Sequence, residues 1–258
     1  MPGRVVLIGR QIAYSASPAM QSAAFRAVGL DWTYELVDVA PADLPQAVAG
    51  LRGPDAMGAN VTIPHKVTII PLLDRIEGDA EAAGAVNTVR REGASLVGSN
   101  TDVAALREAA AAVGVEPEGA DVVVLGVGGS ARAAAVALAG ARICFVARRP
   151  EAATRIGPAL AWSDPNWLAR ARHADLLVNA TPLGRRGEIP LRPGALPPRG
   201  AVIDLVYVRG GTPLVRRARQ LGLRCVDGWT VLLAQGAAAF QTWTGRPAPL
   251  DAMRASLQ

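Results

Sequence analysis

The chain has very few amino groups. It contains 27 lysine and arginine residues, and all of them except Lys66 are arginine. Guanidinium holds its proton at any working pH, whereas a lysine amine can be tuned to give and take one. A single lysine therefore marks either a surface position that survived drift or a site where arginine would fail. Composition alone leaves both interpretations open.

Three further absences exclude whole classes of protein. No apolar run in the 258 residues approaches the roughly 20 needed to span a bilayer. The opening segment enters a strand-like run too early for a signal peptide. The two cysteines, Cys144 and Cys225, lie in apolar runs and do not form a disulfide framework. We expect a cytoplasmic protein with no membrane partner and no metal site.

The formal net charge of +5 raises the question of nucleic acid. The arginines are scattered, however, and the densest group is Arg216, Arg217 and Arg219 on an expected helix. No nucleic-acid motif accompanies them, so no nucleic-acid partner is expected. Positive charge of this kind suits an anionic substrate or cofactor.

Two hydroxyls lie near the start of the first expected helix. A buried strand over Arg4–Ile8 is followed by Ser15 and Ser17, and the helix begins at Pro18. Free N–H groups and the helix dipole favour an anion such as a carboxylate there. The alternative is that Ser17 only caps the helix.

Lys66 follows the third expected strand, Met57–Ile63, and Pro64 is expected to start a helix. Lys66 would then lie in the first turn of that helix, with Thr62 behind it. Strand ends that open into helices are where α/β proteins place ligand sites. Asp102 precedes another expected helix, where its role is either helix capping or a part of the same site.

A dinucleotide pattern begins at residue 121. The apolar strand Asp121–Leu125 leads into Gly126-Val-Gly-Gly-Ser-Ala131, and a helix follows. The first glycine makes the tight turn, the second lets the backbone approach a pyrophosphate, and the small third residue lets helix pack on strand. The next strand, Arg142–Ala147, ends at Arg148 and Arg149 instead of an acidic residue. Two guanidiniums there favour the 2′-phosphate of NADP over NAD.

Three more strands and a final helix complete the pattern. The strands are expected at Asp175–Asn179, Ala201–Leu205 and Leu223–Gly228, and the helix at Thr230–Trp243. Gln235 lies in this apolar helix, where a buried amide either bonds to protein or faces a ligand.

Together these segments resemble the shikimate dehydrogenase family over nearly the whole chain. The matching pieces are Ser15-Ala-Ser17-Pro18, Asn60-Val-Thr-Ile-Pro-His-Lys66, Ala85-Val-Asn-Thr88, Asn100-Thr-Asp102, Gly126-Val-Gly-Gly-Ser-Ala-Arg132, Asn179-Ala-Thr-Pro-Leu-Gly184, Asp204-Leu-Val-Tyr207, Asp227-Gly228 and Gln235. The resemblance implies NADPH-dependent reduction of 3-dehydroshikimate to shikimate, on the route to chorismate and aromatic amino acids.

The resemblance also implies roles for particular residues. Lys66 and Asp102 would form the catalytic pair, and either could deliver the proton. The implied substrate-binding residues are Ser15, Ser17, Thr62, Asn87, Tyr207 and Gln235. The implied NADP(H)-binding residues are Gly126, Gly128, Gly129, Ala131, Arg148, Arg149, Thr181, Val206 and Gly228. The sequence departs from the family at Trp229-Thr-Val231, where Leu-Gly-Met is usual, in the region expected beside the nicotinamide.

The expected fold is α/β with two domains. A substrate-binding α/β domain would comprise residues 1–102, completed by 230–258. A Rossmann-type, doubly wound parallel-sheet NADP-binding domain would comprise residues 103–229. Oxidation of quinate or shikimate with NAD(P), and a non-catalytic ligand-sensing protein on the same fold, are the alternatives. Monomer and homodimer are both compatible with the sequence.

Overall fold

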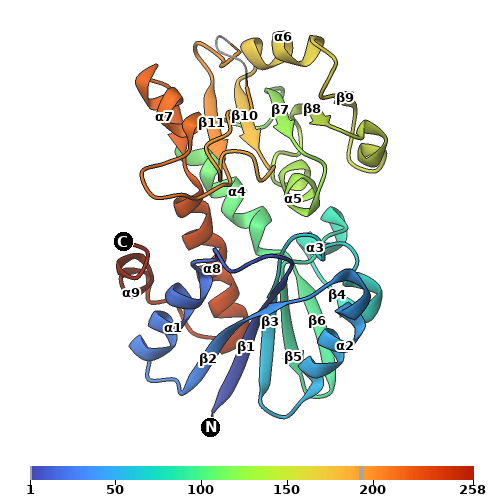
Figure 1. The fold of residues 1–258 in the computed structure, drawn as a ribbon, viewed down its shortest axis with the longest axis vertical. Coiled ribbons are helices and arrows are strands. Elements are labelled where there is room, and N and C mark those ends of the chain that lie inside the picture. The colour runs from blue at the N-terminus through green and yellow to red at the C-terminus, as the bar shows by residue number, and fades with distance from the viewer. Residues whose placement is uncertain (1, 192–194) are drawn as a thin grey trace. The chain divides into compact units, whose positions relative to one another are not determined.

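The structure, a computed structural model, describes residues 2–191 and 195–258, and its chain divides into two compact units (Figure 1). Unit 1 comprises residues 1–102 and 233–258, and unit 2 comprises residues 103–232. The boundaries fall inside two helices, α4 (Thr101–Ala112) and α8 (Gly228–Thr244). The second boundary lies a few residues beyond the expected 229/230.

Unit 1 contains a mixed sheet. Its strands among the described residues run in the order β2-β1-β3-β5-β6-β4. Their bounds are β1 Gly3–Gly9, β2 Trp32–Asp38, β3 Ala56–Val61, β4 Arg75–Ile76, β5 Thr88–Glu92 and β6 Ser95–Ser99. β1, β2 and β3 are parallel, whereas β5 runs antiparallel to both β3 and β6. The short β5–β6 turn contains Gly93 at φ 61°, a conformation that glycine adopts without strain.

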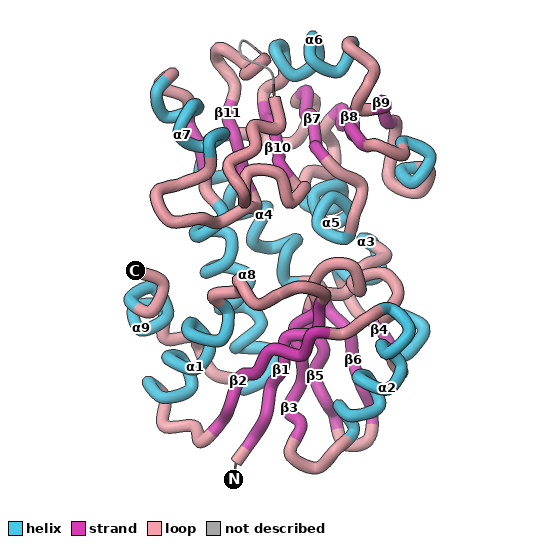
Figure 2. The backbone as a smooth tube through the Cα atoms, viewed as in Figure 1, coloured by secondary structure: helices cyan, strands magenta, loops and turns pink. Residues whose placement is uncertain are grey.

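Helices cover both faces of this sheet (Figure 2). They are α1 Ser17–Ala27, α2 Leu44–Ala49, α3 Asp79–Ala83, the second part of α8 and α9 Leu250–Ala255, with short 3₁₀ turns at Pro41–Asp43, Gly50–Arg52 and Ile70–Leu72. Side chains alternate along a strand. Val6 and Ile8 of β1 therefore pack in one core with α2. On α1, the Phe25 ring stacks on Phe240 of α8 at 5.7 Å.

Unit 2 is a parallel sheet wound in both directions. Its described strands run in the order β12-β11-β10-β7-β8-β9 and pair in parallel throughout. Their bounds are β7 Asp121–Leu125, β8 Arg142–Ala147, β9 Ala159–Ala161, β10 Leu176–Asn179, β11 Ala201–Asp204 and β12 Arg224–Val226. The helices are α5 Gly129–Ala137, α6 Asn166–His173 and α7 Pro213–Gln220, with a 3₁₀ turn at Pro150–Ala153. The winding direction reverses between β7 and β10, and ligands of such sheets bind at that point. The α/β fold class and the doubly wound second sheet are confirmed.

One expected helix is absent. Residues 64–69 form a series of turns, so the prediction that Lys66 lies in the first turn of a helix is wrong. In a helix the Lys66 carbonyl would accept from the amide of Ile70. It accepts instead from Val86 N at 2.7 Å, and Ile70 N bonds to the Val67 carbonyl. The hydrogen bond from Val86, distant in the sequence, thus takes the place of the helical hydrogen bond to the Lys66 carbonyl.

Among the described residues, no helix is both long and apolar enough to cross a membrane.

Candidate functional site

Polar side chains gather at one edge of the unit 1 sheet. Thr62 and Lys66 follow the carboxyl end of β3, and Asp102 follows the carboxyl end of β6. Asn87 immediately precedes β5, which runs in the opposite direction, so its amino end lies at the same edge. The parallel and antiparallel pairings together bring these residues to one place, although they are distant in sequence.

Lys66 and Asp102 form a close, largely buried ion pair. Lys66 Nζ lies 2.5 Å from Asp102 Oδ2, and their side chains are 11% and 12% exposed. Asp102 does not cap α4. The capping contact at the start of this helix comes from Asn100, whose Oδ1 accepts the backbone N–H of Asp102 at 3.1 Å. The second carboxylate oxygen, Oδ1, accepts a hydrogen bond of 2.8 Å from Asn87 Nδ2. The capping alternative for Asp102 is thereby excluded, and both of its oxygens are held within the site.

The two serines lie where the chain leaves β1. Ser15 Oγ accepts the backbone N–H of Ser17 at 3.2 Å, and Ser17 makes no capping bond of its own. The alternative that Ser17 acts as the N-cap is therefore wrong. Thr62 N bonds to the carbonyl of Ile8 in β1, which places Thr62 beside the strand end that leads to the serines. This part of the edge combines two hydroxyls with the N-terminus of an 11-residue helix.

Gln235 lies in α8 and is partly exposed. The carbonyl of its neighbour Gly236 accepts from Gln21 Nε2 of α1 at 2.9 Å. Gln235 is therefore fixed against the same helix that begins at Ser17.

In unit 2 the β7–α5 turn has the shape expected for binding a phosphate group. Gly126 has φ 108°, and a Cβ added there would lie 3.0 Å from the Ala180 carbonyl. A Cβ at Gly128 would meet nothing within 4 Å, so the backbone there is open to a ligand. Gly129 begins α5, and Ala131 is fully buried where the helix packs on the sheet. These positions fit a pyrophosphate at a helix N-terminus.

Arg148 and Arg149 directly follow β8 and are both exposed. Within the described residues neither guanidinium has a hydrogen bond or ion pair with a protein group. An anion can therefore bind them without breaking an existing contact.

A buried network supports the loops after β10 and β11. Asp204 accepts from Asn179 Nδ2 at 2.9 Å, from Thr212 Oγ1 at 2.6 Å and from Val206 N at 3.0 Å. Burial raises the pKa of Asp204, and these three donors only partly oppose that effect. Thr181 donates through its backbone N–H and its hydroxyl to Asn179 Oδ1. Thr181 and Val206 are thus held by one cluster.

Gly228 and Tyr207 lie together in unit 2. A Cβ at Gly228 would come within 2.5 Å of the Val206 carbonyl carbon, so only glycine fits there. The Tyr207 ring packs on Trp229 at 4.9 Å, and Trp229 Nε1 donates to the Val208 carbonyl at 3.1 Å. Trp229, where the family usually has leucine, therefore holds the loop that carries Tyr207.

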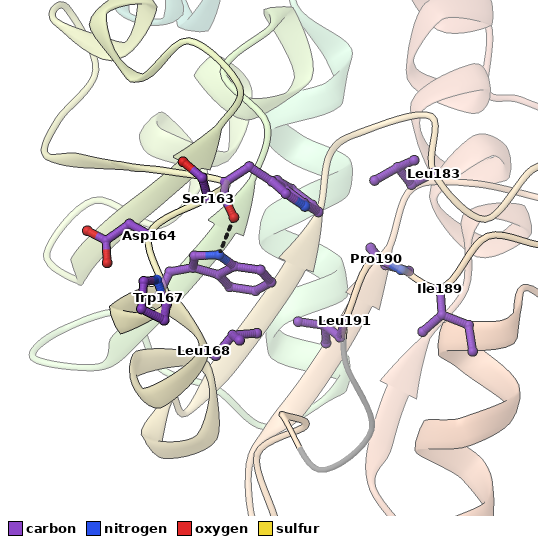
Figure 3. Close-up of a pocket in the computed structure, with 10 residues that line it drawn as sticks. Ser163, Asp164, Trp167, Leu168, Leu183, Ile189, Pro190 and Leu191 are labelled. Carbon is purple, nitrogen blue, oxygen red and sulfur yellow. Dashed lines mark hydrogen bonds between the residues drawn. The ribbon is translucent and has the colours of Figure 1, made fainter.

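Unit 2 also has a cavity of about 540 Å³ that no sequence pattern predicted (Figure 3). Trp167 and Leu168 of α6 line one side, and Leu183, Ile189 and Leu191 line the other. Its wall includes Trp162, whose backbone N–H donates to Ala147, the last residue of β8. The cavity thus adjoins the strand end that carries the paired arginines. Two tryptophans within one short segment were the only signal of it in the sequence.

The unit 1 site contains three residues to which sequence reasoning gave no role. Asn60, Thr88 and Thr101 are buried and make side-chain hydrogen bonds to Asn87 or to one another. All three lie in segments that carry the family resemblance, but nothing in the sequence indicates the hydrogen bonds that they make.

Comparison with known proteins gives concordant matches. Residues 7–89 match the shikimate dehydrogenase substrate binding domain, and residues 228–258 match the shikimate 5'-dehydrogenase C-terminal domain. The chain is 44% identical to the shikimate dehydrogenase (NADP(+)) of Geobacter metallireducens, over 96% of this chain and 93% of the relative.

Two solved structures are also similar. One is the shikimate 5-dehydrogenase of Thermus thermophilus in complex with NADP(H) and shikimate, with TM-score 0.86 and 36% identity over 98% of both chains. The other is a ligand-free 5-ketofructose reductase of a Gluconobacter strain, with TM-score 0.82 and 32% identity over 100% of this chain and 98% of that one. Similar structures therefore carry the names of two different activities.

Proposed function

The chain belongs to the shikimate dehydrogenase family, and from that premise we propose that it reduces 3-dehydroshikimate to shikimate reversibly with NADPH. The reaction is a step towards chorismate and the aromatic amino acids. The observation that carries the proposal is the Lys66–Asp102 pair, 2.5 Å apart at the polar edge of the unit 1 sheet. The protein is an oxidoreductase, and NADP(H) is its cofactor.

Lys66 and Asp102 provide what reduction of a ketone requires. NADPH, when bound, supplies the hydride. Negative charge then develops on the substrate oxygen, where a cation that can also donate a proton lowers the barrier. Lys66 is the group for this oxygen, and Asp102 holds its ammonium in place. The proton at the oxygen is supplied by the pair. In the direction of shikimate oxidation the pair takes that proton back.

Ser15 and Ser17 would bind the substrate carboxylate. Two hydroxyls and an 11-residue helix N-terminus favour an anion there. Tyr207, in unit 2, is a further residue expected to bind the substrate. Thr62 and Gln235 would hold ring hydroxyls, and Asn87 is the third residue expected in that role. A carboxylate subsite distinguishes a shikimate-like acid from an uncharged sugar such as 5-ketofructose.

Unit 2 would hold NADP(H). Gly126, Gly128, Gly129 and Ala131 form the turn for the pyrophosphate, and its open backbone at Gly128 supports this assignment. Arg148 and Arg149 would bind the 2′-phosphate. Thr181, Val206 and Gly228, held by the Asp204 cluster or packed against it, would complete the site.

The test is NADPH oxidation on addition of 3-dehydroshikimate, with wild type compared with Lys66→Met. We expect turnover in the wild type and a fall in kcat of roughly 10²–10⁴-fold in the variant, the range for a lost general acid. Arg26→Met, which removes an exposed cation from the last turn of α1, is the matched control and should keep its kcat. Equal kcat in wild type and Lys66→Met would contradict the role of the pair.

A substrate panel separates the alternatives. Rates with NADPH and NADH on 3-dehydroshikimate, 3-dehydroquinate and 5-ketofructose should be highest with NADPH and 3-dehydroshikimate. Faster reduction of 3-dehydroquinate with NADH would identify the quinate-type activity instead. Saturable binding of shikimate with no turnover would identify a ligand-sensing protein.

We also propose a cytoplasmic location, which the two free cysteines fit because disulfides are rare in that compartment. Monomer and homodimer are both compatible with the proposed reaction, and light scattering on the purified protein distinguishes them.

A further inference from the structure

A chain of buried hydrogen bonds leads to the catalytic pair from the interior of unit 1. Tyr34 Oη donates to Asn60 Oδ1 at 2.8 Å, and Asn60 Nδ2 reaches Thr88 Oγ1 at 3.1 Å. Thr88 Oγ1 lies 3.0 Å from Asn87 Oδ1, and Asn87 Nδ2 lies 2.8 Å from Asp102 Oδ1. Tyr34, Asn60, Thr88 and Asn87 are each no more than 5% exposed. We call Asn60, Thr88 and Asn87 the relay.

Backbone groups determine which way each amide of the relay points. Thr101 N lies 2.7 Å from the Asn87 amide, and because a backbone N–H only donates, the atom facing it is Oδ1. Asn60 lies 3.1 Å from the Asn87 carbonyl, which only accepts, so the atom facing it is Nδ2. The backbone partners therefore fix which end of each side-chain amide is oxygen and which is nitrogen.

The orientation of the Thr88 hydroxyl follows. The Thr88 oxygen accepts a hydrogen bond from Asn60 Nδ2, so the Thr88 O–H can itself act as a donor. The nearer acceptor is Asn87 Oδ1 at 3.0 Å, whereas Thr101 Oγ1 is 3.4 Å away. Every donor from Tyr34 onwards then points towards Asp102. Hydrogen bonds aligned in one direction polarise one another, and this alignment strengthens the last bond, onto the carboxylate.

The same contacts use the whole Asn87 side chain. Its two N–H protons go to Thr101 Oγ1 at 2.9 Å and to Asp102 Oδ1 at 2.8 Å. Its oxygen accepts from Thr101 N and from the Thr88 hydroxyl. Both donors and the acceptor of this side-chain amide thus have partners within unit 1. Asp102 in turn has Oδ1 held by Asn87 and Oδ2 left for Lys66 Nζ.

We propose that Asn60 and Thr88 are positioning residues for the reduction, acting through Asn87, which holds the Asp102 carboxylate with Oδ2 towards Lys66. This inference rests on the proposed function for its catalytic consequence, but its structural claim concerns the environment of Lys66 alone. Thr88 is fully buried in β5 and cannot touch a substrate, so a catalytic effect of changing it must pass through the relay.

The variant that tests the relay is Thr88→Val, which keeps the branched shape and removes the hydroxyl. Thr88→Ser restores the hydroxyl and should restore function. Thr242→Val is the matched control in the same unit, since its half-buried hydroxyl bonds only to the Ala238 carbonyl of its own helix. Tyr34→Phe is a milder second variant, which removes the hydroxyl that begins this series of hydrogen bonds.

The single lysine makes a direct readout possible, because lysine labelled at the ζ nitrogen gives one side-chain NMR signal in this chain, that of Lys66. Without substrate, Thr88→Val should shift this signal, Tyr34→Phe should shift it less in the same direction, and Thr88→Ser and Thr242→Val should leave it in place. An unmoved signal in Thr88→Val would overturn the proposal whether or not the protein reduces 3-dehydroshikimate.

The kinetic readout tests the consequence for the reaction. We expect kcat of Thr88→Val to fall roughly tenfold, the scale found when an outer hydrogen-bond partner is lost, with the KM for shikimate within about twofold of wild type. Thr88→Ser should recover most of the loss. A rise in KM with unchanged kcat, or a Thr88→Ser variant as slow as Thr88→Val, would contradict the relay. A wild type that does not act on shikimate or 3-dehydroshikimate would instead refute the proposed function.

Discussion

The paired arginines after β8 give the sharpest test of cofactor choice. Arg148 and Arg149 are exposed, and within the described residues they make no hydrogen bond or ion pair with protein. They would therefore contribute to NADPH binding without first losing another partner. NADH lacks the 2′-phosphate, so it should not sense either side chain.

The size of the effect follows from exposure. Two unit charges about 4 Å apart interact by about 1 kcal/mol in water and about 4 kcal/mol near a protein surface of lower dielectric. Because both guanidiniums are exposed and screened by salt, the lower end applies, about 1–1.5 kcal/mol each. This corresponds to roughly tenfold in affinity for each arginine, since 1.4 kcal/mol is a factor of ten.

The assay is steady-state kinetics with each cofactor. Arg148→Ala and Arg149→Ala should each raise the KM for NADPH roughly tenfold, and the double variant should raise it more than either single change. The KM for NADH should stay within about twofold. Arg155→Ala, which removes another exposed arginine of unit 2, should change neither value. Equal losses with NADH and NADPH would refute the assignment of the 2′-phosphate to these arginines.

Three further predictions concern single positions. Gly126→Ala should weaken NADPH binding, because φ 108° and the 3.0 Å approach to the Ala180 carbonyl strain any side chain. Gly50→Ala, at φ −61° and in open space, should not; titration of cofactor fluorescence measures both. Burial raises the pKa of Asp204, so the folded state binds its proton more tightly, and the stability of wild type relative to Asp204→Asn should fall as pH rises above 3.8. Thermal unfolding of both proteins across pH measures this difference, and a difference that does not change with pH would contradict the raised pKa. Glu77 should show the opposite dependence on pH, because its hydrogen bond from Arg90 lowers its pKa. Wild type should be more stable than Glu77→Gln by about 1 kcal/mol or less at this half-exposed pair, above pH 4.5. The difference should fade as pH falls through the pKa of Glu77 in the folded state, and a difference that is constant with pH would contradict a stabilising role of the pair.

The sequence predicted best those features that depend on local pattern. The run Asp121–Leu125, the glycine turn after it and the strand Arg142–Ala147 all lie as expected, because strand, turn and helix here are set by neighbouring residues. It failed where a distant group competes with a local one. In the turns around Lys66 the Lys66 carbonyl accepts from Val86, distant in the chain, and no window around Pro64 contains that contact.

Pattern named residues that meet at the polar edge of unit 1, but it did not predict their connections. For Asn87 the resemblance implies a contact with a substrate hydroxyl, and it does not imply the bonds from its amide to Thr101 and Asp102. The contact between Thr88 and Asn60 arises from the antiparallel pairing that sets β5 beside β3. Pairing between strands decides such contacts, and residue spacing alone does not specify it.

The lone lysine fits the role proposed for it beside Asp102. Several arginines of this chain hold a carboxylate by the two-pronged contact that suits a guanidinium, as between Arg142 and Asp121, where both bonds measure 2.8 Å. At Asp102 the cation meets one oxygen, Oδ2, while Asn87 Nδ2 bonds to the other. An ammonium needs only that one oxygen, and as an amine it can also transfer a proton, which a guanidinium does not do at working pH. A chain with 27 cationic side chains thus has its single lysine at the position where the proposed reaction needs a cation that can give up a proton.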